Sequence, residues 1–261
     1  MERSGLNRFS VVHEKKKKNG IVWLEFELLQ IFPKIKHGVF LNLKLGEKDP
    51  PENRLKALEL FALSKGVTLK QCHQTDIKEI GQYDQNLLHF DGYDGMVTAE
   101  KDTGLLIRHA DCQATVFYDP VRQVIGNVHC GWRGSVRNIY RKAVDKMTLL
   151  YQTNPSDLIV CVGPSLGPNS AEFKHYKQEL PETFWKYQTR PTYFDFWEIS
   201  RMQLTTVGIP EKQIEIAEIC TYENEAECFS YRRNKNTSRH GTLVGIVSNQ
   251  PTPSDPLSDL S

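Results

Sequence analysis

The sequence predicts a mixed α/β (α+β) fold, in which one layered α-β-α domain is built around a mixed β-sheet. Short apolar runs of strand type alternate with a few amphipathic helical patterns, and their uneven spacing does not fit regular βαβ repeats. With 261 residues the chain is long enough for one large domain. We expect a single domain over residues 11–247, a flexible N-terminus at 1–10 and a disordered tail at 248–261, rich in Pro, Ser and Asp.

The predicted strands are apolar runs bounded by turn residues. In chain order they cover residues 21–32, 38–45, 67–73, 95–99, 105–107, 115–118, 124–129, 158–162, 214–219, 229–232 and 242–247. The predicted helices have apolar residues at helical spacing and cover 53–65, 136–151, 179–187 and 198–207. Gly66 is placed as the stop of the first helix. Residues 131–134 are expected to form a turn, after which Ser135 caps the second helix.

Composition excludes several classes of protein. A formal net charge of +1 gives no basic excess for binding nucleic acid. No apolar run approaches the roughly 20 residues that span a bilayer, and the N-terminus lacks the apolar stretch of a signal peptide. The six cysteines have no regular spacing, so we expect free thiols and a reducing cytoplasm rather than a disulfide framework.

Three soft or borderline ligands lie near the ends of predicted strands: His73, Cys112 and His129. Cys112 and His129 are 17 residues apart, which suits neighbouring strands joined by a turn. If His73 joins them, the set has two imidazoles, one thiolate and an open fourth position, as a hydrolytic zinc site requires. No Cys-x-x-Cys knuckle is present, which argues against a closed structural zinc site.

A rival interpretation needs no metal. Cys112 is then a nucleophilic thiolate and His129 its general base, as in cysteine hydrolases. The spacing of the residues alone leaves both alternatives open.

Several motifs in fixed order extend the pattern from about Lys36 to Val247. They are Asp94-Gly95-Met96-Val97-Thr98, Ala110-Asp111-Cys112, Val128-His129-Cys130-Gly131-Trp132-Arg133-Gly134, Gly163-Pro164-Ser165-Leu166-Gly167-Pro168, Cys220-Thr221-Tyr222 and Phe229-Ser230-Tyr231-Arg232-Arg233. This order resembles the bacterial laccase-domain family, also described as multicopper polyphenol oxidases or purine nucleoside phosphorylases.

The resemblance implies a cysteine-hydrolase-like α-β-α fold and a zinc ion held by His73, Cys112 and His129. It implies phosphorolysis of adenosine, inosine and methylthioadenosine to the free base and a ribose phosphate. Adenosine deamination is a second activity of the family. The implied partners are a purine nucleoside and phosphate, and a homodimer is a candidate assembly. Copper-dependent phenol oxidation is the least supported activity, because eight histidines with no His-x-His pair are too few for a multicopper centre.

Further residues are candidates for the chemistry. Asp111 is the carboxylate nearest in sequence to the thiol and is a candidate proton shuttle or support for the ligand. Arg133, in a glycine-flanked turn before a helix, suits an anion contact. Arg232 and Arg233 are candidate substrate-binding residues.

The chain departs from the family pattern at two places. Arg108-His109 stands where a threonine is usual before Ala-Asp-Cys, so His109 adds an imidazole and is a further candidate for substrate binding. The family's Gly-Gly-Val-Ser loop is shortened over residues 39–46. A third alternative is therefore a nucleoside-binding relative with weakened turnover.

Overall fold

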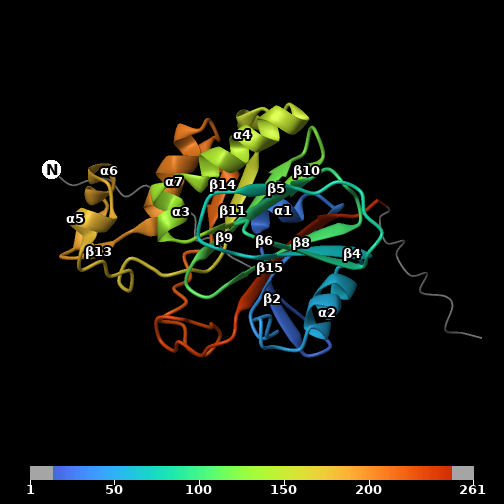
Figure 1. The fold of residues 1–261 in the computed structure, drawn as a ribbon, viewed down its shortest axis with the longest axis horizontal. Helices are drawn as coiled ribbons and strands as arrows, with labels where there is room; N and C mark the ends of the chain where they lie inside the picture. The colour runs from blue at the N-terminus through green and yellow to red at the C-terminus, as the bar shows by residue number, and fades with distance from the viewer. Residues whose placement is uncertain (1–13, 249–261) are drawn as a thin grey trace, which may run out of the picture.

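Two β-sheets packed face to face organise the chain in the computed structural model, which describes residues 14–248 (Figure 1). One sheet has seven strands in the order β1-β2-β3-β15-β8-β4-β6, and the other has six in the order β14-β11-β9-β10-β7-β5. A third sheet pairs β12 with β13.

The strands of these sheets are β1 Glu14–Lys18, β2 Ile21–Glu25, β3 Ile35–Phe40, β4 Lys65–Lys70, β5 Ile77–Glu79, β6 Leu87–Asp91, β7 Gly95–Thr98, β8 Thr103–His109, β9 Gln113–Asp119, β10 Val124–Cys130, β11 Ile159–Val162, β12 Gln188–Arg190, β13 Tyr193–Phe194, β14 Ile214–Ile216 and β15 His240–Ile246. The helices are α1 Glu27–Gln30, α2 Glu52–Leu60, α3 Trp132–Val136, α4 Ile139–Tyr151, α5 Tyr176–Glu179, α6 Glu182–Trp185 and α7 Phe196–Thr206.

Both large sheets are mixed. The β4 strand runs parallel to β6 and β8, while β8 and β3 run antiparallel to β15. In the other sheet β9 is antiparallel to β10 and β11, whereas β11 pairs with β14 in parallel. The predicted mixed α/β class is confirmed, but the strands are divided among several sheets instead of forming one. The cysteine-hydrolase-like detail stays a prediction.

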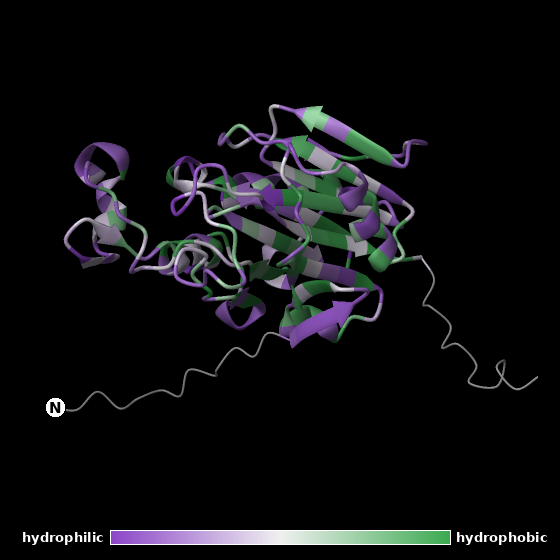
Figure 2. Ribbon diagram, turned by 90° about the horizontal axis from the view of Figure 1, so that it is seen from below, coloured by the Kyte–Doolittle hydropathy of each residue, from purple (hydrophilic) through white to green (hydrophobic). Residues whose placement is uncertain are grey.

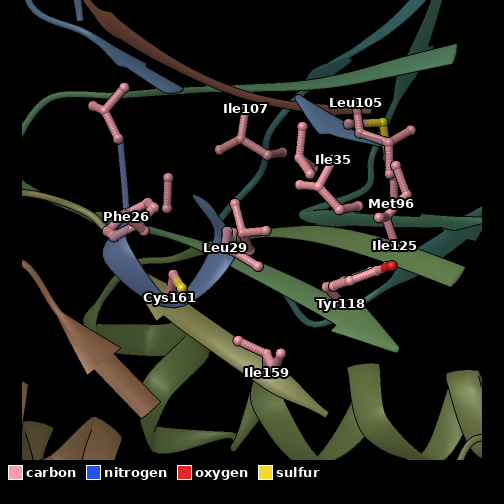
Figure 3. Packing of buried hydrophobic residues seen from close by; sticks show 14 of the residues in the cluster. Phe26, Leu29, Ile35, Met96, Leu105, Ile107, Tyr118, Ile125, Ile159 and Cys161 are labelled. Carbon is pink, nitrogen blue, oxygen red and sulfur yellow. The ribbon is translucent and has the colours of Figure 1, made fainter. Parts of the chain in front are cut away.

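The central strands β8, β9 and β10 bury both of their faces, which explains why two sheets stack. Side chains alternate along a strand, so in β9 Val116 and Tyr118 face the other sheet while Phe117 faces the helices. In β8 Ile107 faces the space between the sheets and Leu106 faces outward. Figure 3 shows Ile107 and Tyr118 entering the same apolar layer from opposite sheets.

Helices cover the outer faces. The α4 and α7 helices pack on the six-stranded sheet, and α2 packs on the seven-stranded sheet, so the layers run α-β-β-α (Figure 1). Figure 2 shows hydrophobic residues concentrated along the central strands, while the projecting α5–α6 region is mainly hydrophilic. The buried apolar layers fix the sheets against each other.

Three parallel strands place their carboxyl ends at one edge of the seven-stranded sheet. After each of β4, β6 and β8 the chain crosses to the six-stranded sheet, through residues 71–76, 92–94 and 110–112. Because parallel strands end at the same edge, these three crossings lie together at one end of the double sheet.

Several predicted elements are wrong in extent. The strand expected at 21–32 stops at Glu25 and is followed by α1, because the carboxylate of Glu215 accepts the backbone N–H groups of Glu27 and Leu28. The helix expected at 53–65 ends at Leu60, since Ala62 has a positive φ of 54°. Gly66 therefore lies within β4 and is no helix stop.

Two predicted helices are broken. The one expected at 136–151 begins as α3, where a turn was expected at 131–134, and restarts as α4 beyond Asn138, whose φ is 53°. Asn138, and not Ser135, caps α4 by accepting the N–H of Arg141. The helix expected at 179–187 is divided at Pro181 into α5 and α6. Residues 229–232, expected as a strand, form no strand because their N–H groups bond side chains and not another strand: Phe229 donates to the ring of His240 and Arg232 donates to the carboxylate of Asp111.

The predicted flexible N-terminus at 1–10 lies outside the described residues, as does the predicted tail at 248–261 apart from Ser248, which donates its N–H to Asp102. Over residues 14–248, no helix is both long and apolar enough to cross a membrane. All six cysteines are free thiols, as expected. The cytoplasmic location stays a prediction.

Candidate metal centre

The crossings between the sheets carry the predicted ligands. His73 lies in the crossing after β4, Cys112 ends the crossing after β8, and His129 lies near the end of β10. One ligand atom of each side chain lies within 4.8 Å of the other two. Cys112 Sγ is 3.9 Å from His73 Nε2, and the two imidazole rings meet edge to face at 4.9 Å between centroids. Tertiary folding thus brings together three residues that are far apart in sequence.

Asp94, in the crossing after β6, holds two of these ligands in place. Its carboxylate accepts the backbone N–H groups of Cys72, His73 and Gln74 at 2.7 to 3.1 Å, which fixes His73 in a left-handed conformation with a φ of 60°. One carboxylate oxygen also lies 2.8 Å from Nδ1 of His129. Since an ionised carboxylate only accepts, Nδ1 carries a hydrogen, and Nε2 is the ring nitrogen that would bind a metal in place of its own proton.

The charges of this cluster support one another. Burial alone raises the pKa of Asp94, but the hydrogen bond and positive charge of His129 lower it to about 2. Burial also raises the pKa of Cys112, yet the charge of His129 and hydrogen bonds from both histidines bring it down to about 6. Burial lowers the pKa of His129, whereas the Cys112 charge and Asp94 raise it to about 9. Thiolate and carboxylate therefore face a shared cationic imidazole.

Because Gly131 has no side chain, it leaves room for the side chains of His73 and Cys112. A Cβ at this position would lie 2.9 Å from Cδ2 of His73 and 3.1 Å from Sγ of Cys112. The ligand side chains therefore pack directly against backbone on one side. On the other side they line an open pocket of about 790 Å³.

This donor set fits a metal ion. Two imidazole nitrogens and a thiolate are the ligands of tetrahedral zinc sites, and three protein ligands facing an open pocket leave one position for substrate. The support of His129 by a carboxylate is the usual arrangement around a metal-bound histidine. Cys130, the next residue in β10, faces the helix layer, and burial raises the pKa of its thiol to about 12, so it takes no part.

Asp111 does not face the ligands. Its carboxylate accepts the hydroxyl of Thr221 at 2.8 Å and the backbone N–H of Arg232 at 2.6 Å, and its own φ is 90°. It joins the crossing after β8 to the loop that follows β14. Its expected role in proton transfer stays a prediction.

The three candidate arginines lie outside the pocket lining. Arg133 is exposed on α3, with its guanidinium 4.3 Å from the centroid of the Trp132 ring. Arg232 donates to the carbonyl of Glu172 at 3.2 Å. Arg233 donates to several loop carbonyls, among them Thr221 at 2.9 Å. The structure therefore does not bring these side chains to the ligand cluster.

His109 does line the pocket. Its ring is almost fully buried, and Nε2 lies 2.9 Å from the hydroxyl of Thr242. Nδ1 has no hydrogen-bond partner among the described residues. Burial, followed by the nearby His240 and His129, lowers its pKa well below 6.5. His109 is therefore a neutral imidazole beside the centre.

Asp94 is a site residue for which the sequence patterns predict no role, although it begins the first of the ordered motifs. A signal was available in retrospect: Asp94, like His73 and Cys112, lies three residues beyond a strand that ends at the same sheet edge. The parallel pairing that brings them together is not readable from one sequence.

Fold and site together define a mixed α/β protein with a His-Cys-His cluster suited to a metal ion. The chain belongs to the family described as multi-copper polyphenol oxidoreductase laccase, whose model matches residues 38–248. That match agrees with the resemblance carried by the ordered motifs.

Individual relatives are named purine nucleoside phosphorylases, although the family is described by its laccase name. The chain is 34% identical over 180 residues to a purine nucleoside phosphorylase of Bacteroides thetaiotaomicron, covering 62% of this chain and 66% of that relative. It is 31% identical over 238 residues to the purine nucleoside phosphorylase YlmD of Geobacillus stearothermophilus, covering 80% of this chain and 84% of the relative. The crystal structure of that YlmD aligns over 90% of this chain and all of its own, with a TM-score of 0.75 and 25% identity.

Proposed function

We propose that the protein is a zinc-dependent purine nucleoside phosphorylase that converts adenosine, inosine or methylthioadenosine and phosphate to the free base and ribose 1-phosphate. The observation that carries this proposal is the His73, Cys112 and His129 cluster open to a pocket of about 790 Å³. A pocket of that size holds a nucleoside and an anion together. The names of the relatives supply the reaction class.

Zinc is the metal we favour. The cluster offers one thiolate and two imidazoles, and among the described residues no other group of three or more metal-binding side chains is found. A multicopper centre requires further histidine clusters. Copper oxidation of phenols therefore has the least support, although a single copper ion would find acceptable ligands here.

A zinc ion at this cluster would supply Lewis-acid chemistry that polarises an oxygen of the substrate. The chain's own residues would do the rest. Asp94 orients His129 and sets the hydrogen on Nδ1, so that Nε2 faces the pocket. Cys112 reaches the site as a thiolate. Basic side chains along the pocket, including Arg108 and Arg239, would hold the attacking phosphate near the sugar.

One observation favours a second candidate, a cysteine hydrolase. The lowered pKa of Cys112 and raised pKa of His129 describe a thiolate–imidazolium pair, the reactive form of such nucleophiles. His73 distinguishes the two, because a thiolate nucleophile has no need of a second imidazole 3.9 Å from its sulfur.

The test is to incubate the purified, zinc-loaded protein with adenosine and phosphate and to separate the products by chromatography. Adenine with ribose 1-phosphate, dependent on phosphate, supports the proposal. Inosine indicates the additional deaminase activity. Absence of both products contradicts the proposal and supports a nucleoside-binding relative with weakened turnover.

A further inference from the structure

Three arginines surround the short segment 45–47 at the edge of the pocket, Arg54 and Arg108 through their side chains and Arg239 through its backbone. Arg54 Nη2 donates to the carbonyl of Gly46 at 3.3 Å, and Arg108 Nη2 lies 3.7 Å from a carboxylate oxygen of Glu47. Arg239 accepts the N–H of Leu45 on its own carbonyl at 3.1 Å. Arg108 and Arg239 line the metal pocket, and Arg108 with Arg54 lines a second, adjoining pocket of about 320 Å³.

Arg108 Nη2 donates to the carbonyl of Leu69 at 2.9 Å, and Arg239 Nη1 donates to the carbonyls of Thr237 and Ser238 at 2.8 and 3.0 Å. Two of the three guanidinium groups nevertheless keep a donor without a partner. The side chain of Arg108 is only 8% exposed, and its Nε has no hydrogen-bond partner. The Nε of Arg54 is also buried without a partner. A buried donor that is left without a hydrogen bond destabilises the fold. Such donors in the wall of an open pocket are expected to be satisfied by a ligand.

The scarcity of ion pairs around these arginines also indicates a site for an anion. Within the described part of the chain, Arg54 and Arg239 form no ion pair, and Arg108 has only Glu47, whose side chain is 69% exposed. Burial and the positive charges of Arg54 and Arg239 lower the pKa of Arg108, while Glu47 raises it. Three cations thus lie within electrostatic range of one another, and among the described residues Glu47 is the one carboxylate within ion-pair distance of any of them. The carboxylate of Asp49, in the same pocket wall, accepts the N–H of Gly46 and the hydroxyl of Ser238 instead.

We propose that Arg54, Arg108 and Arg239 form a binding site for a phosphate oxyanion beside the metal centre. Planar guanidinium groups bind phosphate through paired, charge-assisted hydrogen bonds, and the free Nε atoms offer donors of this kind. Assigning the oxyanion to the phosphate co-substrate rests on the proposed function, whereas the binding itself does not. A nucleotide's phosphate has the same chemistry and is the other source.

Replacing Glu47 distinguishes an anion-binding site from a structural ion pair with Arg108. If it is the structural partner of Arg108, Glu47→Gln lowers the melting temperature and leaves phosphate affinity unchanged. If it competes with the bound anion, the same change tightens phosphate binding several-fold. Only the second result fits an anion site.

The experiment is calorimetric titration of the zinc-loaded protein with inorganic phosphate, and separately with adenosine 5′-monophosphate. We expect phosphate binding to weaken by about tenfold in Arg108→Gln and in Arg239→Gln, because each removes a charged donor. Arg122→Gln, an exposed arginine in the β9–β10 turn outside both pockets, should bind as the parent does. Arg239 is less buried than Arg108, so its variant keeps the test valid if Arg108→Gln fails to fold.

Unchanged affinity in both arginine variants, or no phosphate binding by the parent at millimolar concentration, overturns the proposal. Tighter binding of the nucleotide than of phosphate, with the same loss in the variants, supports the site and identifies the nucleotide as the source. Phosphate binding without release of base from adenosine contradicts the proposed function and leaves this site standing. Release of base with an unchanged KM for phosphate in both variants supports the proposed function and contradicts this arginine site.

Discussion

His129 meets Asp94 twice: its Nδ1 lies 2.8 Å from a carboxylate oxygen, and its backbone N–H donates to the carbonyl of the same residue at 2.7 Å. Asp94 also binds the three N–H groups around His73. One fully buried carboxylate therefore positions two of the three ligands. The metal centre depends on a residue that would not itself touch the metal.

Replacing Asp94 by Asn should weaken zinc binding by about 10–100-fold, because the amide neither fixes the tautomer of His129 nor carries the charge that supports it. Competition with a chromogenic chelator measures this affinity. Asp91→Asn is the matched control, since Asp91 ends the preceding strand and is exposed. Equal zinc affinities of Asp94→Asn and the parent would contradict the role assigned to Asp94.

Gly131→Ala should loosen the same centre without changing any ligand. The added methyl would lie 2.9 Å from the His73 ring, so the ring has to move away from Cys112. We expect about tenfold weaker zinc binding and a small fall in melting temperature. Gly81→Ala, where a Cβ meets nothing within 4 Å, is the control. Zinc binding as tight as in the parent would show that the ligands need no such space.

The metal-free protein should show a reactive thiolate. Because the pKa of Cys112 is lowered from 9.0 to about 6, its contribution to stability is fully present above pH 9 and is lost as pH falls through about 6. The pKa of His129 is raised from 6.5 to about 9, so its contribution is fully present below pH 6.5 and is lost as pH rises through about 9. The ion pair therefore exists between about pH 6 and pH 9.

Alkylation by iodoacetamide measures this titration. In a Cys72→Ser background, which removes the neighbouring exposed thiol, the rate should rise with a midpoint near pH 6. Zinc should suppress the reaction. A midpoint near pH 9 would contradict the predicted ion pair.

Asp111→Asn separates support of a loop from catalysis. The side chain holds Thr221 and the N–H of Arg232, so the variant should lose about 1–3 kcal/mol of unfolding free energy and keep its zinc. Denaturant titration and metal analysis check both points. A fall in kcat of about a hundredfold at unchanged stability would instead support the proton-transfer role expected from the sequence.

The sequence predicts most of the strands whose ends carry the metal centre, because those strands are apolar and bounded by turns. The choice of His73, Cys112 and His129 rested on the ordered family motifs as well as on their positions at or just beyond strand ends, because spacing alone left the metal and nucleophile interpretations open. What could not be predicted depends on distant contacts. The short α1 helix exists because Glu215, almost two hundred residues away, accepts its first N–H groups.

The division into two sheets was missed for a related reason. Strands buried on both faces read as continuous apolar runs, which are typical of one sheet between helices and equally of two stacked sheets. The role of Asp94 and the clustering of Arg54, Arg108 and Arg239 both follow from which strands pair, and local patterns do not encode that pairing.

Metal analysis of the purified protein and its Cys112→Ser variant tests the central claim most directly. The three-ligand centre predicts one equivalent of zinc in the parent and in the Cys72→Ser control, and none in Cys112→Ser. A parent enzyme that is active after complete removal of metal, and is inactivated by alkylation of Cys112, would contradict the metal centre and make the thiol a nucleophile.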